Sequence, residues 1–119
     1  MTSAIQRLGT TTRFSQIVIH QHTAYLAGQV SQLIEGDISD QAQDVFGKID
    51  ALLATAGSDK NHLLSAQIWL ADMADYEAMN QAWDAWLTGV GAPVRVCVQS
   101  PMAKKHYRIE VQVIAALTA

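Results

Sequence analysis

The sequence predicts a two-layer α+β fold, in which two helices lie on one face of a mixed sheet of five to six strands. Short runs of alternating apolar and polar residues indicate strands with one buried face. Two longer stretches carry apolar residues at the helical period of about 3.6 residues. Two helices are too few to cover both faces of such a sheet, so we expect them on one face. A length of 119 residues fits a single domain over residues 1–119.

A hairpin is expected near the start of the chain. Residues 15–20 and 24–30 have the composition of strands, and residues 21–23 form the turn between them. A further short strand can form over residues 5–8. Gly28 lies within the second strand of the hairpin, where a glycine marks a bulge or the close approach of another group.

The first helix is predicted to end at Gly57, which can adopt the left-handed conformation that terminates helices. Ser39 or Asp40 can cap its N-terminus, and Gln43 lies three residues after Asp40, as a capping box requires. The apolar stripe of this helix consists of Ala42, Val45, Phe46, Ile49, Leu52, Leu53 and Ala56.

A strand over residues 64–70 and a second helix follow. Asp72 or Asp75 can cap this helix. Its apolar stripe consists of Tyr76, Met79, Trp83, Trp86 and Leu87. We interpret Trp83 and Trp86 as core residues; the less favoured alternative is a platform on which nucleobases stack.

Two short alternating runs, residues 94–99 and 107–113, predict the last two strands. In each run the apolar side chains share one face, which we expect to be buried, and the polar side chains share the other. The polar faces carry Arg95 and Cys97 in the first run and Glu110 in the second. If the two strands pair as an antiparallel hairpin, their connection permits a register with Arg95 directly opposite Glu110.

Self-association is expected, because several strands look apolar on both faces. Residues 17–19 and 113–117 are examples. The face of the sheet without helices then needs cover, since exposed apolar patches of that size are rare on monomers.

Arg95, Glu110 and Cys97 are the candidate functional residues. The planar guanidinium of Arg95 suits bidentate recognition of a carboxylate; the alternative is an ion pair or an interface arginine. Glu110 can accept a proton or hold a water molecule, and its alternative role is a cross-strand salt bridge. No histidine is adjacent to Cys97 in the sequence, which favours an inert thiol lining the pocket over a nucleophile.

The composition disfavours several other classes of function. The net charge is −3 and the longest basic run is Lys104–Lys105, so we do not expect tight binding to a nucleic-acid backbone. His20 and His22 lack further ligands at metal-site spacing, so no metal is predicted. We recognise no signal peptide and no membrane-spanning stretch, and the single cysteine favours the reducing cytoplasm.

Taken together, these residues resemble the reactive-intermediate deaminase family, also called RidA or YjgF and often labelled endoribonuclease L-PSP or translation initiation inhibitor. The resemblance extends over nearly the whole chain. The segments that carry it are Phe-Ser-Gln at 14–16, Ala-Gly-Gln-Val at 27–30, the helix at 41–57, and the strands at 92–98 and 108–115. Their order and spacing together are more specific than any one segment.

The resemblance implies a fold like that of Bacillus chorismate mutase and a homotrimer with sites between neighbouring subunits. It also implies hydrolysis of imines or enamines, such as 2-iminopropionate and 2-aminoacrylate, to a 2-keto acid and ammonia without a metal or organic cofactor. In this scheme Arg95 clamps the substrate carboxylate, while Glu110 and the backbone carbonyl of Cys97 hold the attacking water. Gly28 forms the opposite wall from the adjacent subunit, and Asn80 supports the site.

Two expected substrate-binding positions depart from the family pattern. Phe14 stands where many members have tyrosine, and Ala27 where many have serine, so two hydroxyl groups are absent. These departures indicate either that the substrate is a different imino acid from the usual one of the family, or that the protein binds small carboxylates such as keto acids without turnover. RNA cleavage, which only the family label suggests, is disfavoured by the acidic balance of the chain.

Overall fold

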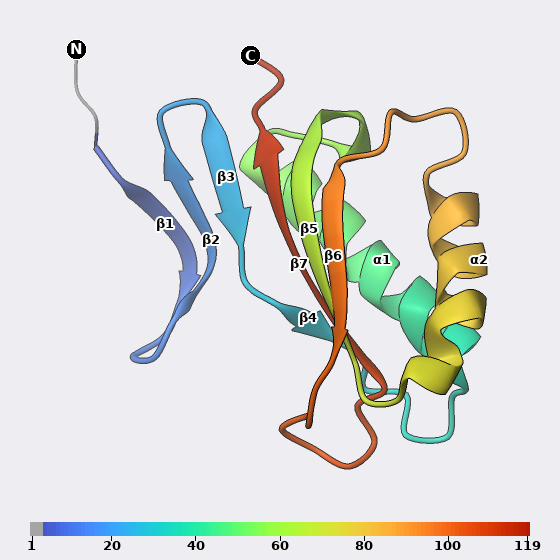
Figure 1. Cartoon of the computed structure of the whole chain (residues 1–119). Coiled ribbons are helices and arrows are strands. Elements are labelled where there is room, and N and C mark those ends of the chain that lie inside the picture. Colours follow the sequence, from blue (N-terminus) through green and yellow to red (C-terminus); the bar gives the residue numbers. More distant parts are fainter. Residues whose placement is uncertain (1–3) are drawn as a thin grey trace.

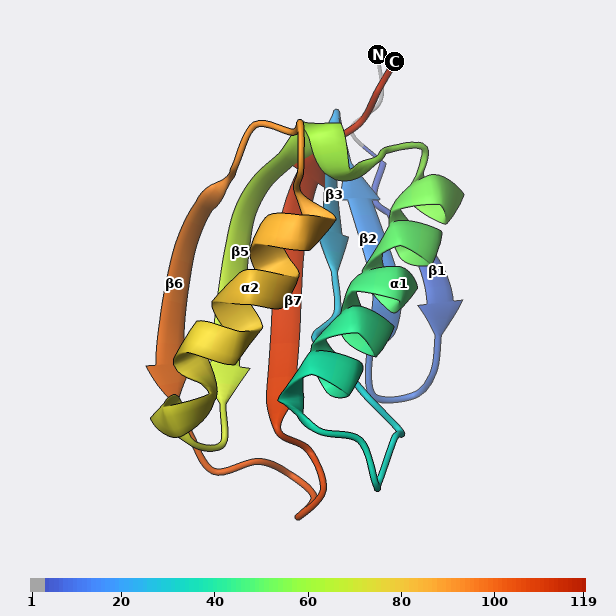
Figure 2. The ribbon, with the colours of Figure 1, turned by 90° about the vertical axis from the view of Figure 1, so that its right-hand side faces the viewer.

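In the computed structural model of the chain, residues 4–119 form one layer of sheet and one layer of helices (Figure 1). Figure 2 shows both α-helices in front of the same face of the sheet. The strands are β1 (Gln6–Thr10), β2 (Ser15–His20), β3 (Thr23–Leu26), β4 (Gln29–Val30), β5 (Leu63–Leu70), β6 (Val94–Gln99) and β7 (Ile109–Ala116). The helices are α1 (Ile38–Ala56) and α2 (Tyr76–Trp86), with short 3₁₀ turns η1 (Lys60–His62) and η2 (Met73–Asp75). The predicted two-layer α+β class is confirmed, with seven strands in place of five to six.

The strands follow the order β1-β2-β3-β7-β5-β6, and β4 also pairs with β7. β5 and β6 are parallel, whereas the other pairs are antiparallel. The chain passes from β5 to β6 through α2, and such a helical crossover joins parallel strands. β7 then pairs with the other edge of β5. The last two strands therefore do not pair as a hairpin, the register that would place Arg95 opposite Glu110 does not form, and β5 separates the two residues.

The valine face of β6 is exposed in the single chain, so its expected burial is wrong. The exposed fractions are 73%, 57% and 47% for Val94, Val96 and Val98. The register explains the difference, because Arg95 pairs with Ala66 of β5, and Ala66 pairs with Val113 of β7. Ala66 and Val113 belong to the core beneath the helices. Laterally paired residues point to the same face, so Arg95 and Cys97 face the helical layer.

α1 is capped at both ends by local interactions. The carboxylate of Asp37 accepts a hydrogen bond from the backbone N–H of Asp40. In return, the carboxylate of Asp40 accepts a hydrogen bond from the backbone N–H of Asp37. This capping box begins before the predicted caps at Ser39 or Asp40, so that prediction is wrong and Gln43 has no part in it. Gly57 ends the helix in the left-handed conformation, with φ of 85°, as predicted.

α2 packs against α1 through an aromatic cluster. This cluster consists of Trp83 and Trp86 from α2 and Phe46 from α1, whose rings contact one another in stacked and edge-to-face arrangements. Both tryptophans are buried, so their prediction as core residues is confirmed. Asp72 caps the η2 turn, while Asp75 precedes α2 without a side-chain cap bond. Within residues 4–119, neither α-helix combines the length and apolarity needed to cross a bilayer.

The second strand of the N-terminal hairpin is interrupted. The strand predicted over residues 24–30 is split into β3 and β4, because Ala27 and Gly28 leave the ladder between them. β4 then resumes pairing with β7 beside Glu110. The interruption brings Gly28 directly against the Glu110 side chain, the close approach that the glycine predicts.

Candidate active site

Arg95 lies against two aromatic side chains of α2. Its Nη2 donates a hydrogen bond to the hydroxyl of Tyr76 at 3.3 Å. Its Cζ lies 5.2 Å from the centre of the Trp83 ring and 5.9 Å from that of Tyr76, within the range of cation–π attraction. Within residues 4–119 no carboxylate lies within 4.0 Å of this guanidinium. The half-buried group therefore keeps donors for an anion from outside the chain.

Cys97 follows Arg95 on the same face of β6 and is half-buried. Burial raises the pKa of the thiol, and the positive charge of Arg95 offsets only part of this rise. The thiol is therefore protonated at neutral pH. This state agrees with the expected inert side chain and disfavours a thiolate nucleophile.

Asn80 occupies the same face of α2 as the two aromatic residues. It lies four residues after Tyr76 and three before Trp83, and these spacings place side chains next to one another on a helix. Its Oδ1 is buried and has no hydrogen-bond partner within the described residues. A buried polar atom without a partner is costly, and this oxygen can still accept a hydrogen bond that the described residues do not supply. We call Arg95, Cys97, Tyr76, Asn80 and Trp83 the arginine half-site.

Glu110 lies on the other face of the sheet, beside the break between β3 and β4. It pairs with Val30 of β4 on one side and with Trp69 of β5 on the other. A methyl group added at Gly28 would overlap the carboxylate oxygen Oε2 of Glu110. A side chain at residue 28 would therefore have to displace this carboxylate from its position.

The segment that carries Gly28 is fixed by two glutamines. The backbone N–H of Ala27 donates to the backbone carbonyl of Gln16 at 2.9 Å. The amide Nε2 of Gln29 donates to the carbonyl of Ala27 at 3.0 Å and to the side-chain oxygen Oε1 of Gln16 at 2.9 Å. Gln29 is only 8% exposed, so these bonds are shielded from water. They hold the backbone of Ala27 and Gly28 against Glu110.

A hollow of about 450 Å³ adjoins Gly28 on this side of the molecule. Its eight lining residues come from β2 and the residue before it, from β3, from the following break and from β7: Phe14, Ser15, Val18, Tyr25, Leu26, Ala27, Gly28 and Gln112. We call it the β3 hollow. Phe14, Ala27, Gly28 and Glu110 form what we call the glutamate half-site, and three of these four residues border the hollow.

The structure separates the predicted site residues into these two half-sites. Arg95 lies on the face that Val113 shares, because both pair with Ala66. Glu110 lies three residues before Val113 on β7 and so points to the opposite face. One copy of the chain therefore cannot bring Arg95 and Glu110 to the same small molecule.

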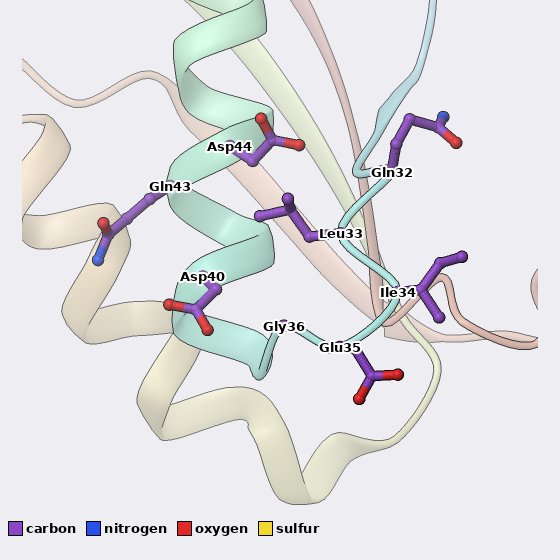
Figure 3. Close-up of a pocket in the computed structure, with 8 residues that line it drawn as sticks. All are labelled: Gln32, Leu33, Ile34, Glu35, Gly36, Asp40, Gln43 and Asp44. Carbon is purple, nitrogen blue, oxygen red and sulfur yellow. The ribbon is translucent and has the colours of Figure 1, made fainter.

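Another hollow, of about 830 Å³, lies between α1 and the segment that precedes it (Figure 3). It contains none of the predicted site residues. Asp40 belongs to the capping box of α1, and Asp44 accepts a 2.7 Å hydrogen bond from the hydroxyl of Ser31. These two carboxylates of the hollow therefore form hydrogen bonds within the chain that stabilise its fold. Across residues 4–119, no group of three or more His, Cys, Asp and Glu side chains is placed to hold a metal ion.

Sequence reasoning missed four residues of this arrangement. Tyr76 was placed in the apolar stripe and Trp83 was read as core or as a base-stacking platform, and neither was linked to Arg95, although their helical spacing with Asn80 marks a shared face. Gln16 and Gln29 occur in segments that carry the family resemblance, but a glutamine in a strand does not reveal its partner. Only the three-dimensional contacts identify these roles.

Comparison with known proteins assigns the chain to a family. The family model described as Endoribonuclease L-PSP matches residues 4–117. The chain belongs to the endoribonuclease L-PSP family. A relative from Haemophilus influenzae, named RutC family protein, is 46% identical over 112 residues, which cover 93% of this chain and 97% of that protein. The suspected kinship with RidA and YjgF proteins is thereby confirmed.

Solved structures of the L-PSP family share the fold. A member of the YjgF protein family from Neisseria meningitidis matches with a TM-score of 0.93 and 38% identity, covering 98% of each chain. A more distant mouse relative, named 2-iminobutanoate/2-iminopropanoate deaminase, is 28% identical over 128 residues, covering 97% of this chain and 94% of that protein.

Proposed function

We propose that the chain is a hydrolase that converts 2-imino acids and their enamine tautomers into 2-keto acids and ammonia. The observation that carries this proposal is the half-buried Arg95 guanidinium, which has no carboxylate partner within residues 4–119. Such a group suits two-point binding of the carboxylate of a small acid. The name of the mouse relative supports the same reaction.

The proposed site is shared between two copies of the chain. Arg95 and Glu110 lie on opposite faces of one sheet, so the arginine half-site of one copy must meet the glutamate half-site of the next. The exposed valine face of β6 supports contact between copies, since such apolar surface is usually covered. We propose a homotrimer with three equivalent sites, the closed ring that the family resemblance implies.

The reaction needs orientation and proton transfer more than a strong nucleophile. Arg95 fixes the carboxylate of the substrate, and Glu110 with the backbone carbonyl of Cys97 holds a water against the imine carbon. The water oxygen adds to this carbon while a proton passes through Glu110 to the imine nitrogen, which gives a carbinolamine. The hydroxyl proton then passes to the nitrogen by the same route. The C–N bond breaks, and keto acid and ammonia leave.

The remaining predicted residues have supporting roles in this proposal. Gly28 leaves room for the Glu110 carboxylate. The buried Oδ1 of Asn80 accepts a hydrogen bond from the substrate, which supplies the partner it lacks within the described residues. Phe14 and Ala27 form the wall next to Gly28.

The proposal is tested by supplying imines in situ with an L-amino-acid oxidase and following their disappearance and the release of ammonia. Arg95→Ala should lower kcat/KM by at least about 10²-fold, because the substrate carboxylate loses its charged partner. Lys105→Ala, which removes one positive charge from an exposed loop position, serves as the control. An unchanged rate in Arg95→Ala would end the proposal. Binding of keto acids at Arg95, with ammonia release at background, would instead favour the non-catalytic alternative.

A further inference from the structure

The groups that orient the guanidinium of Arg95 carry no charge. Its Nη2 donates to the hydroxyl of Tyr76 at 3.3 Å, and its Cζ lies 5.2 Å and 5.9 Å from the ring centres of Trp83 and Tyr76. A phenol oxygen and the faces of two aromatic rings attract a cation without cancelling its charge. A carboxylate in the same place would pair with the guanidinium and compete with an incoming anion. This environment therefore orients Arg95 and leaves its charge available to a ligand.

The start of α2, which carries Tyr76, is fixed by two polar contacts. Figure 2 shows this end of the helix beside the end of β6, where the side-chain oxygen of Gln99 accepts a 2.8 Å hydrogen bond from the backbone N–H of Met73. Asp75 accepts a hydrogen bond from Nη2 of Arg108 at 3.0 Å, so its carboxylate already has a cationic partner. The two contacts hold the phenol in place relative to the neighbouring strands.

We propose that Tyr76 is a positioning residue, whose hydroxyl aligns the Arg95 guanidinium with the carboxylate of the ligand. The inference rests on the proposed function of the arginine half-site and adds the residue that orients its cation. Two parallel N–H···O bonds form only when the guanidinium and the carboxylate share a plane. A guanidinium that rotates more freely satisfies this condition for a smaller part of the time, so the affinity for the carboxylate falls.

The test compares Tyr76→Phe, which keeps the ring and removes only the hydroxyl, with the wild-type chain. One assay follows the imine made in situ from L-alanine by an L-amino-acid oxidase, and the other is an NMR titration with pyruvate, which requires no turnover. We expect KM for the imine and Kd for pyruvate to rise about fivefold while kcat stays within about twofold, because the carboxylate is bound alike in the ground and transition states. Unchanged KM and Kd would overturn the inference.

Tyr107→Phe is the matched control. It makes the same chemical change in the connection between β6 and β7, outside both half-sites, and should leave Kd, KM and kcat within about twofold of the wild-type values. Thermal unfolding of both variants shows whether the fold is retained. A rise in Kd of equal size in Tyr107→Phe would contradict a specific role of the Tyr76 hydroxyl.

Arg95→Lys separates a positioning role from a purely structural one. Lysine keeps the positive charge but has no planar fork to align. In the Arg95→Lys background, Tyr76→Phe should therefore change the Kd for pyruvate by less than about twofold, against about fivefold in the arginine background. An equal loss in both backgrounds would show that the hydroxyl does not act through the guanidinium.

The two assays also distinguish this inference from the proposed function. If the wild-type chain binds pyruvate but releases ammonia only at background, the deaminase function fails, while a loss of affinity in Tyr76→Phe still supports the positioning role. A wild-type chain that neither binds pyruvate nor releases ammonia would overturn both.

Discussion

Arg95 and Glu110 lie on opposite faces of one sheet, with β5 between their strands. Glu110 is level with Trp69 of β5, and Trp69 is level with Val98 of β6, three residues beyond Arg95. The two residues are therefore offset by about 9.5 Å across the sheet and about 10 Å along it. With their side chains directed to opposite sides, a site that uses both residues requires two copies of the chain.

Mixed assemblies test this division directly. Arg95→Ala and Glu110→Gln should each be inactive alone, but co-expression should restore activity, because some sites combine an intact Arg95 with an intact Glu110. In rings assembled at random from equal amounts, about one site in four is intact, so about a quarter of the wild-type rate is expected. The double variant, mixed with either single variant, should regain nothing. No recovery in the first mixture would contradict a shared site.

Gly28→Ala should remove activity while the fold persists. The added methyl group overlaps the Glu110 carboxylate, and displacement of this group by about 1 Å is expected to lower kcat/KM by about 10²-fold. Gly91→Ala is the matched control, because a Cβ at Gly91 meets nothing within 4 Å. Steady-state kinetics and thermal unfolding of both variants decide the outcome. Full activity of Gly28→Ala would show that the position of Glu110 is not critical.

Gln29→Ala should destabilise the chain. It removes two hydrogen bonds and leaves the Ala27 carbonyl and the Gln16 side chain without their donor, at a cost of about 1–3 kcal/mol. The exposed Gln32→Ala should change the free energy of unfolding by less than about 0.5 kcal/mol. Urea denaturation measures both values. Equal stability of the two variants would mean that the Gln29 bonds contribute little.

Val96→Glu should dissociate the proposed homotrimer. Val96 is exposed at the centre of the valine face of β6, and a carboxylate buried there in a subunit contact would lack a partner. Ile34→Glu, which places the same charge at an exposed apolar residue outside the sheet, is the control. Light scattering at matched concentrations should give a lower mass for Val96→Glu only. A wild-type mass for this variant would exclude the valine face as the contact.

Cys97 should behave as a protonated thiol. Since burial raises its pKa, the thiolate forms only at a pH above that of an unperturbed cysteine, and alkylation by iodoacetamide at neutral pH should be slower than for free cysteine. Cys97→Ser should keep kcat/KM within about threefold, because the proposed role belongs to the backbone carbonyl. Rapid alkylation at neutral pH, or a loss of about 10²-fold in this variant, would indicate a nucleophile instead.

Local sequence patterns were sufficient for the elements but not for all of their pairings. The stripe of α1, its end at Gly57 and the alternation in β7 are set by neighbours in the chain, and they were predicted correctly. The partner of β6 depends on contacts with β5, far away in sequence. Alternation shows that Val96 and Arg95 point to different sides, but it does not show which side the helices cover. In the sequence, the valine face of a strand at the edge of a sheet therefore has the same pattern as a face buried in the core.

The candidate site was predicted as a set of residues and not as an arrangement. Gly28 was expected to be approached closely, and the Glu110 carboxylate is the group that approaches it. Arg95 was expected either to pair with a carboxylate of the protein or to bind one from outside, and within residues 4–119 it has no carboxylate partner. Its aromatic neighbours on α2 were missed, because an apolar helical stripe gives the same pattern for a core and for the wall of a site.

The central position of β7 has a consequence for synthesis and folding. β7 is the last of the described strands to be synthesised. It lies between β3 and β5 and pairs with both, and these two strands do not pair with each other. Until residues 109–116 have left the ribosome, the β1–β3 ladder and the β5–β6 ladder have no strand in common. We therefore expect the sheet to form after translation of this segment, at the slower rate typical of distant pairings. A nascent chain stalled before residue 109 would hold two unjoined pieces of sheet.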